Sequence, residues 1–164
     1  MHITTEGAYA IFGDDTYNAV IYGNLYNWFT VHDERGLCME GYHVPSDEEW
    51  TILTDYLGGE EVAGGKMKEC TIGSCSESEF WNSPNTGATN ESSFTALPAG
   101  ARSSGSNANY NQLGNFSFFW SASEQGSNWA CSREISYYSP EINIDGNSCG
   151  TNQHNGFSIR CLAD

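Results

Sequence analysis

The sequence predicts one α+β domain, in which one or two helices pack on a small antiparallel sheet and long irregular loops join them. The clearest helix pattern comes early, over residues 46–57, and short alternating patterns typical of strands come late, from residue 117 onward. The chain has 164 residues, of which 18 are Gly, and Asn and Ser are also frequent, which favours turns and short strands over a helical bundle. This length predicts a single domain over residues 1–164.

The predicted helix has a start signal, an apolar face and a stop signal. Ser46 followed by Glu49 forms a capping box, and Asp47 adds negative charge where the helix dipole favours it. One face is apolar because suitable residues recur at i, i+3, i+4 and i+7: Trp50, Leu53, Thr54 and Leu57. The pair Gly58-Gly59 ends the helix, and residues 62–68 are expected to form a further short helical turn.

The remaining chain predicts short strands separated by loops. Residues 8–12 suggest a short strand, and residues 20–31 are apolar and aromatic without deciding between helix and strand. Residues 69–93 read as a long irregular region, which Trp81 and Phe94 are expected to hold to the core. The expected strands are 94–100, 117–121, 129–136, 141–145 and 156–162, with turns at Ser139-Pro140 and Asp145-Gly146.

Composition excludes several partners. The formal net charge is −15, from six Lys and Arg against 21 Asp and Glu. Nucleic acids and anionic membrane surfaces both need clustered cations, so neither is expected as a partner. No apolar run is long enough to span a bilayer, and the first ten residues lack the regions of a signal peptide. A signal or anchor is therefore expected outside this segment.

Six cysteines occur in an even number and without a Cys-x-x-Cys motif, which favours disulfides over a zinc site. Fifteen pairings are open in principle. We expect Cys38–Cys161, which would tie the chain end to the start of the helix, and also Cys70–Cys75 and Cys131–Cys149. The second pair would close a small loop and the third would flank a hairpin. Such bonds imply an oxidising compartment, and the alternative is a set of reduced cysteines in the cytosol.

Several blocks in fixed order carry a family resemblance. They are YGNLYNW at 22–28, GLCMEGYHVPSDEEWTILTDYLGG at 36–59, AGGKMKE at 63–69, WNSPNTGATNESSFTALPAGAR at 81–102, FWSASE at 119–124 and GFSIRCL at 156–162. Together they resemble the Fibrobacter succinogenes major paralogous domain of secreted bacterial proteins. The resemblance covers about residues 20–162 and implies a C-type lectin-like fold of the formylglycine-generating-enzyme type. The Cys70–Cys75 insert departs from it, and the lack of a clear first strand suggests a truncated start.

The resemblance also implies a candidate function, since similar folds include the variable proteins of diversity-generating retroelements. In those proteins the diversified positions lie in the last third of the chain, and their template adenines make asparagine codons frequent. Residues 115–155 fit this pattern. In and just after this segment, residues that look fixed alternate with a scatter of Asn, Ser, Tyr, Phe, Asp and His. The residues that look fixed are Trp120, Ser121, Glu124, Gly156, Phe157 and Arg160. The alternative is ordinary loop composition in a paralogous domain.

We therefore expect an extracellular or cell-surface bacterial module that binds a protein or a glycan. Tyr and Arg supply contact energy at interfaces, and Asn and Ser adapt as hydrogen-bonding groups. The candidate contact residues are Phe116, Phe118, Asn128, Arg133, Tyr137, Tyr138, Asn143, Asp145, Asn147 and His154. If the strand alternates, one of Phe116 and Phe118 is expected to be structural. Tyr137 and Tyr138, beside a turn, are the preferred candidates.

An enzyme is not expected. Formylglycine-generating oxidases use reactive cysteines near the C-terminus, and Cys131 with Cys149 would be the candidates for that alternative. A structural interaction module of a larger secreted protein is a further alternative. The histidines are far apart in sequence, so no catalytic or metal cluster is predicted. No cofactor is expected. Calcium would suit the abundant Asp, Asn and Glu oxygens, but the EF-hand pattern is absent. The Trp-Asn-Asp motif of calcium-dependent sugar-binding lectins is also absent, because Trp81-Asn82 is followed by Ser83.

Overall fold

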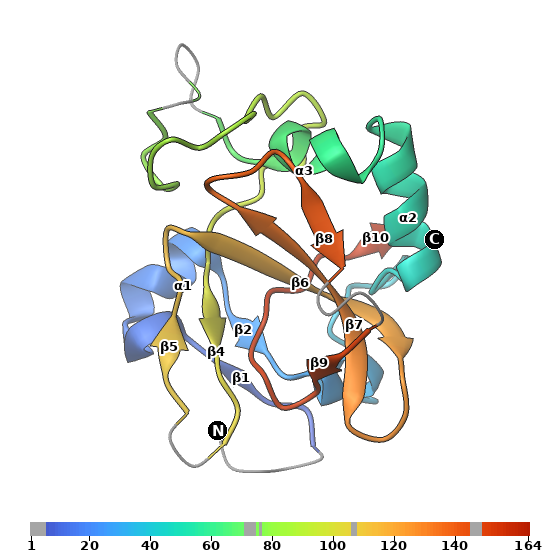
Figure 1. Cartoon of the computed structure of the whole chain (residues 1–164). Coiled ribbons are helices and arrows are strands. Elements are labelled where there is room, and N and C mark those ends of the chain that lie inside the picture. The colour runs from blue at the N-terminus through green and yellow to red at the C-terminus, as the bar shows by residue number, and fades with distance from the viewer. Residues whose placement is uncertain (1–5, 71–74, 76, 106–107, 145–148) are drawn as a thin grey trace.

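The computed structural model describes residues 6–70, 75, 77–105, 108–144 and 149–164, and it has the predicted α+β composition (Figure 1). The helices are α1 (Thr16–Tyr22), α2 (Asp47–Tyr56) and α3 (Glu60–Met67), with 3₁₀ turns η1 (Phe12–Asp14) and η2 (Trp28–His32). The strands are β1 (Tyr9–Ala10), β2 (Leu25–Tyr26), β3 (Tyr42–His43), β4 (Ala101–Arg102), β5 (Tyr110–Asn111), β6 (Phe116–Glu124), β7 (Trp129–Ser136), β8 (Ile142–Ile144), β9 (Thr151–Asn152) and β10 (Leu162–Ala163).

The central sheet is built on β7 and is antiparallel throughout. β6 pairs with one edge of β7, with Phe116 opposite Ser136 and Trp120 opposite Ser132. The other edge of β7 pairs with β8 near its end and with β9 near its start. The predicted strands 117–121, 129–136 and 141–145 are thus confirmed as β6, β7 and β8, the last within slightly narrower bounds. Smaller antiparallel pairs, β1–β2, β10–β3 and β4–β5, surround this sheet.

Alternation along the strands gives the sheet two packed faces. On one face Phe119, Ile135 and Ile142 form a buried cluster with residues of α2 and α3, including Trp50 and Met67. The helices cover this face in Figure 1. The opposite face carries Trp120 and Ala130, which pack with Trp28, Ala101 and Phe157. Because side chains alternate along a strand, every second residue of β6 and β7 faces α2 and α3 and the others face away.

Helix α2 confirms the prediction made from its sequence. The Ser46 hydroxyl accepts from the Glu49 backbone N–H, and the Glu49 carboxylate accepts from the Ser46 N–H, so that the capping box is complete. Trp50 is buried and its indole N–H donates to the carbonyl of Trp120 over 3.4 Å. Gly58 follows the helix with φ of 105°, a left-handed conformation that glycine adopts without strain. Local sequence alone explains both ends of this helix.

Helix α3 is unusual because two glycines, Gly64 and Gly65, occupy its middle, where they cost helix propensity. A Cβ atom on Gly64 would lie 2.1 Å from the Glu141 carbonyl oxygen, and one on Gly65 would lie 2.3 Å from the Gly87 carbonyl oxygen. The glycines therefore let the helix backbone contact the start of β8 and a neighbouring loop directly.

The described residues between 69 and 93 contain neither helix nor strand, as predicted, and aromatic side chains hold this segment. Trp81 is 3% exposed, and its indole N–H donates to the carbonyl of Ala96 over 2.9 Å. Phe94 packs against Trp50 and Phe119. The guanidinium of Arg160 stacks on the Phe94 ring and donates to its carbonyl. Both aromatic anchors expected from the sequence are confirmed.

Three disulfides are present, and they are the three expected pairs: Cys38–Cys161, Cys70–Cys75 and Cys131–Cys149. The first joins residues 123 positions apart, next to the β3–β10 pair, so the chain end is fixed beside the start of α2. Within the described part of the chain, no helix is both long and apolar enough to cross a bilayer.

The remaining strand and turn predictions need correction or completion. Residues 156–162 do not form one strand: single bridges join Gly156 to Arg102, Phe157 to Tyr26 and Ser158 to Phe119, and only the end of the segment enters β10. The segment crosses three partners in turn, so no continuous ladder can form. Residues 94–100 likewise make only isolated bridges before β4. Residues 20–31 divide among α1, β2 and η2, and residues 8–12 contain β1. The predicted turn Asp145-Gly146 lies outside the described residues.

Candidate ligand-binding surface

The aromatic candidates gather where β6 begins and β7 ends. The Phe116 and Phe118 rings are stacked, with centroids 5.6 Å apart and planes inclined by 12°. Phe118 in turn stacks on buried Phe157 at 4.8 Å. At the other end of the row, Phe116 contacts the Tyr138 ring edge-to-face at 5.9 Å. A continuous row of rings therefore leads from the core to the surface.

Phe116 and Phe118 correct one step of the sequence argument. Alternation was expected to send one ring to the core and the other to the surface, but residues two apart lie on the same face of a strand. Both rings are half-buried on the face away from α2 and α3. Phe118 is the structural member of the pair, since it packs against the cluster of Trp120 and Phe157, whereas Phe116 extends that cluster toward Tyr138.

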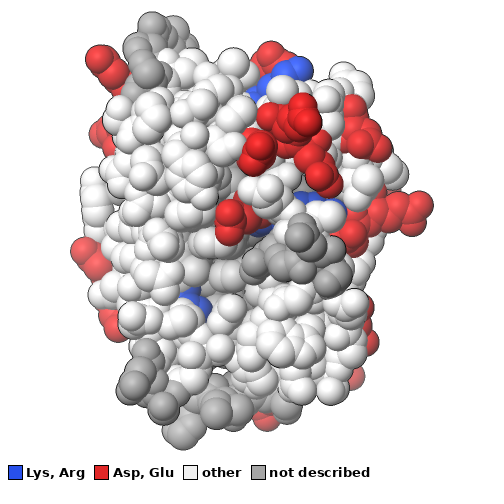
Figure 2. Space-filling view, in the orientation of Figure 1, with Lys and Arg blue, Asp and Glu red and all other residues white. Residues whose placement is uncertain are grey.

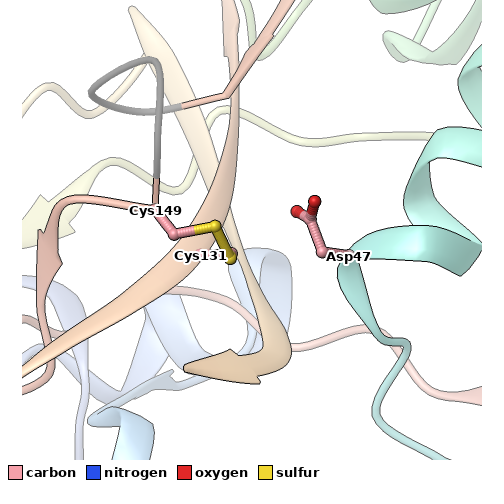
Figure 3. A group of neighbouring side chains, drawn as sticks. All are labelled: Asp47, Cys131 and Cys149. Carbon is pink, nitrogen blue, oxygen red and sulfur yellow. A yellow bond between two sulfur atoms is a disulfide. The ribbon is translucent and has the colours of Figure 1, made fainter. Parts of the chain in front are cut away.

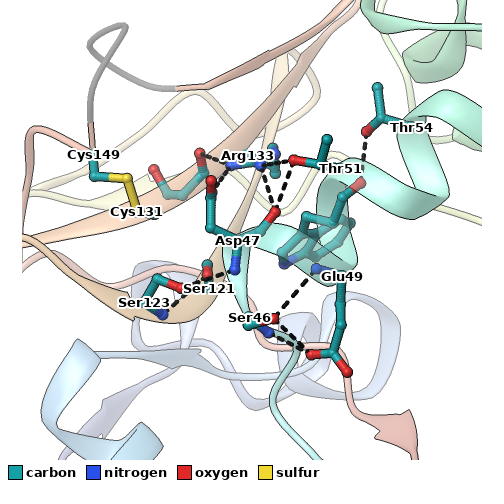
Figure 4. A network of polar contacts seen from close by, with 12 residues as sticks. Ser46, Asp47, Glu49, Thr51, Thr54, Ser121, Ser123, Cys131, Arg133 and Cys149 are labelled. Atoms are coloured by element: carbon teal, nitrogen blue, oxygen red, sulfur yellow. Dashed lines mark hydrogen bonds and ion pairs between the residues drawn. A yellow bond between two sulfur atoms is a disulfide. The ribbon is translucent and has the colours of Figure 1, made fainter.

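Arg133 is not an exposed contact residue, contrary to its place among the candidates. It shares a face with Ile135, so its side chain points toward α2, and the residue is 2% exposed. Its guanidinium forms an ion pair with the Asp47 carboxylate and donates to the Asp47 carbonyl over 3.2 Å (Figure 4). Arg133 therefore joins the sheet to the first turn of α2 and has no free surface for a ligand.

Tyr137 and Tyr138 follow β7 directly and differ in exposure. The Tyr137 ring packs against the cluster under α2 and α3, while Tyr138 is 56% exposed. The two rings contact each other edge-to-face at 5.3 Å. The Tyr137 backbone is held on both sides, because its N–H donates to the Asn115 carbonyl and its carbonyl accepts from the Thr86 N–H. Tyr138 is thus an exposed ring on a fixed backbone.

The other candidates do not join this group. Asn128 is exposed at the far end of β7, where His154 lies half-buried with its ring 5.0 Å from that of Phe29. That end of β7 is about 23 Å from Ser136 at the usual strand rise. Asn143 is exposed on β8, on the same face as Phe116 and Phe118. Asp145 and Asn147 lie outside the described residues.

Trp129 and a short chain of side-chain amides also lie at the surface and were not predicted from the sequence. Trp129 begins β7, beside Asn128, and is 46% exposed. Asn82 donates to the Asn115 side chain over 2.9 Å, and Asn115 donates to the Gln112 side chain over 3.4 Å. Asn82 and Gln112 are exposed. Trp129 could have been found from the expected strand 129–136, whereas the amide chain joins loops that no local pattern relates.

Charge is distributed unevenly over the surface. In Figure 2 carboxylates gather at the upper right, over α2 and α3, whose exposed residues include Glu48, Asp55, Glu60 and Glu61. Most of the left half of the same view, where β6 begins, is uncharged. On this face of the molecule, the gathered carboxylates therefore lie away from the start of β6.

Comparison with family models gives a match to the Fibrobacter succinogenes major domain over residues 2–163. This chain belongs to that family. The resemblance drawn from the sequence blocks is thus confirmed, over a range that begins before residue 20. A search of curated proteins and a search of solved structures each gave no match.

One group of three potential metal ligands occurs among the described residues of this Fibrobacter succinogenes major domain. A carboxylate oxygen of Asp47 and the sulfur atoms of Cys131 and Cys149 lie within 4.8 Å of one another (Figure 3). The two sulfurs are bonded to each other, and the carboxylate is paired with Arg133. A metal-ligating thiolate must be free, so in this state the group is a disulfide beside an ion pair. The oxidase alternative, which needs thiols, gains no support from it.

Proposed function

We propose that this Fibrobacter succinogenes major domain is an extracellular or cell-surface bacterial binding module that contacts a protein or glycan through side chains of its C-terminal third. We further propose that its fold is C-type lectin-like, of the formylglycine-generating-enzyme type, and that a diversity-generating retroelement varies the contact positions. Three disulfides support an oxidising location.

One observation carries the proposal: exposed side chains of the last third project from a scaffold that is cross-linked and packed on both faces. Tyr138 and Asn143 are exposed, while the strands next to them contribute Ile135 and Ile142 to the core. The Cys131–Cys149 bond joins β7 to the segment that precedes β9. A contact surface that is already ordered loses little conformational entropy on binding. Because the core is made by other residues, such as Ile135 and Ile142, exposed side chains on this surface can vary without loss of the fold.

The test begins with a screen of the disulfide-bonded protein against a glycan array and a panel of cell-surface proteins. For any ligand found, we expect Tyr138→Ala to weaken binding by about tenfold or more, because exposed tyrosines are frequent hot spots. Asn143→Ala should weaken it less. The matched control is Tyr56→Ala, which removes an 86%-exposed tyrosine from α2. Binding that survives both changes in the last third, but is lost on substitution of residues 82–92, would place the site on the other loop.

Diversification has its own test in the neighbouring DNA. A reverse-transcriptase gene beside a near-copy of the 3′ coding region, differing at adenines of the copy, would support it. If the copy exists and the differing codons fall outside residues 115–155, the proposed variable surface is wrong.

A further inference from the structure

Lys68 is the most buried charged side chain described, and it lies directly beneath the proposed contact turn. The residue has 0% exposure although it carries an ammonium group. It follows α3, and its Nζ atom donates to three backbone carbonyls: Thr86 at 2.7 Å, Ser136 at 2.9 Å and Ser139 at 3.0 Å. An ammonium has three N–H donors, so these bonds use all of them.

Two of the three acceptors enclose the tyrosine pair. Ser136 ends β7 and Ser139 precedes Pro140, so one ammonium binds the carbonyls on both sides of Tyr137 and Tyr138. The third acceptor, Thr86, donates its own N–H to the Tyr137 carbonyl. The Pro140 carbonyl accepts from the N–H of Gly65 over 2.8 Å. Helix α3 therefore holds the whole turn through its backbone and through Lys68.

A buried charge is costly unless polar groups satisfy it, and here backbone carbonyls do so. Burial lowers the pKa of Lys68 to about 8, so the group is still mostly protonated at neutral pH and can donate three bonds. The indole of Trp81 lies 5.5 Å from Nζ and adds a favourable ring contact. A methionine at position 68 would fill similar space. It has no N–H group, so the carbonyls of Thr86, Ser136 and Ser139 would lose their bonds to Nζ.

We propose that Lys68 is a positioning residue that fixes the turn of residues 136–139 and so presents the exposed Tyr138 ring, with Phe116 beside it, to the ligand in a preformed geometry. The inference rests on the proposed binding function, whose contact residue it names. The affinity of this surface then depends on Lys68, a buried side chain that the ligand does not contact.

The experiment measures hydrogen exchange at single amides in the ligand-free, disulfide-bonded protein and in Lys68→Met. The reporters are the N–H of Thr86, which donates to the Tyr137 carbonyl, and the N–H of Tyr137, which donates to the Asn115 carbonyl. The N–H of Trp120 on β6, which donates to the Ser158 carbonyl, reports a place away from the turn. We expect the two turn amides to exchange about tenfold faster or more in Lys68→Met, with a much smaller change at Trp120, because local opening needs less free energy than global unfolding. Lys66→Met, which removes a partly exposed lysine paired with Glu91, is the matched control.

A second measurement needs no variant and covers the case in which Lys68→Met does not fold. In the wild-type protein, the Lys68 ammonium should give a slowly exchanging ¹⁵N signal with couplings to the carbonyl carbons of residues 86, 136 and 139. An ammonium signal averaged with solvent would overturn the inference, as would unchanged exchange at Thr86 and Tyr137 in a folded Lys68→Met. If both measurements agree with the inference but Tyr138→Ala leaves binding intact, the turn is positioned as described and the proposed contact residue is what fails.

Discussion

The guanidinium of Arg133 pairs with the carboxylate of Asp47 across the junction between β7 and the first turn of α2. The two side chains are unequally exposed, at 3% for Arg133 and 30% for Asp47. The same arginine also reaches the backbone carbonyl of Asp47. Sheet and helix are therefore joined by a charged contact next to the Cys131–Cys149 disulfide (Figure 4).

The unequal exposure predicts unequal costs of removing each partner. Asp47→Asn leaves a buried guanidinium without its counter-charge and is expected to lower the free energy of unfolding by about 3 kcal/mol. Arg133→Met leaves a carboxylate that water can reach, so its cost should be smaller, about 1–2 kcal/mol. Urea unfolding of both variants checks this. Arg35→Met, which breaks an exposed pair with Asp33, should cost less than either of these changes, and an equal cost at Arg35 and Arg133 would contradict the account.

Helix capping gives a second prediction. Ser46→Ala removes a hydroxyl that accepts from the Glu49 N–H and donates to the Glu49 carboxylate. The free energy of unfolding should fall by about 1 kcal/mol, the usual cost of losing such a cap. Thermal unfolding against Ser127→Ala, an exposed serine in the turn between β6 and β7, measures it. If Ser46→Ala lowers the melting temperature no more than Ser127→Ala does, the cap contributes little to stability beside the packing of Trp50.

The disulfides should differ in value according to the loops that they close. Cys38–Cys161 spans 123 positions and Cys70–Cys75 spans five. On the chain-entropy model, replacing both cysteines by alanine should cost about 5 kcal/mol for the first pair and about 2 kcal/mol for the second. Denaturant midpoints of the two double variants provide the comparison, and the reverse order would show that native packing rather than loop length decides the contributions.

Helix α2 could be predicted from sequence because its determinants are local, as Ser46 and Glu49 show. The strand pattern at Phe116–Trp120 was also local, but no local pattern tells which face of a strand meets a helix. Arg133 was therefore assigned to the surface, although it shares parity with Ile135 and points inward. Lys68 carried no signal at all, since its acceptors are 18, 68 and 71 positions away and are backbone atoms. Long-range polar contacts of this kind depend on the completed fold.

The last prediction concerns pH and the chain end. The His43 ring lies between two carboxylates, with Nδ1 2.7 Å from Asp164 and Nε2 2.9 Å from Glu49. Only the protonated imidazole can donate to both, so hydrogen bonds to Asp164 first and Glu49 second raise the pKa of His43 above 6.5. Because the folded pKa is the higher one, the stabilisation is complete below pH 6.5 and is lost as pH rises through the raised value.

We therefore expect the urea midpoint of the wild-type protein to fall more between pH 6 and pH 8 than that of His43→Gln, which keeps a donor but cannot titrate. The protection of the β3–β10 amides, taken at each pH as the ratio of the intrinsic to the observed exchange rate, should fall over the same pH interval, since His43 ends β3 and Asp164 follows β10. If the urea midpoint of His43→Gln keeps the full pH dependence of the wild-type protein, the His43 imidazole between Glu49 and Asp164 is not the group whose titration changes the stability.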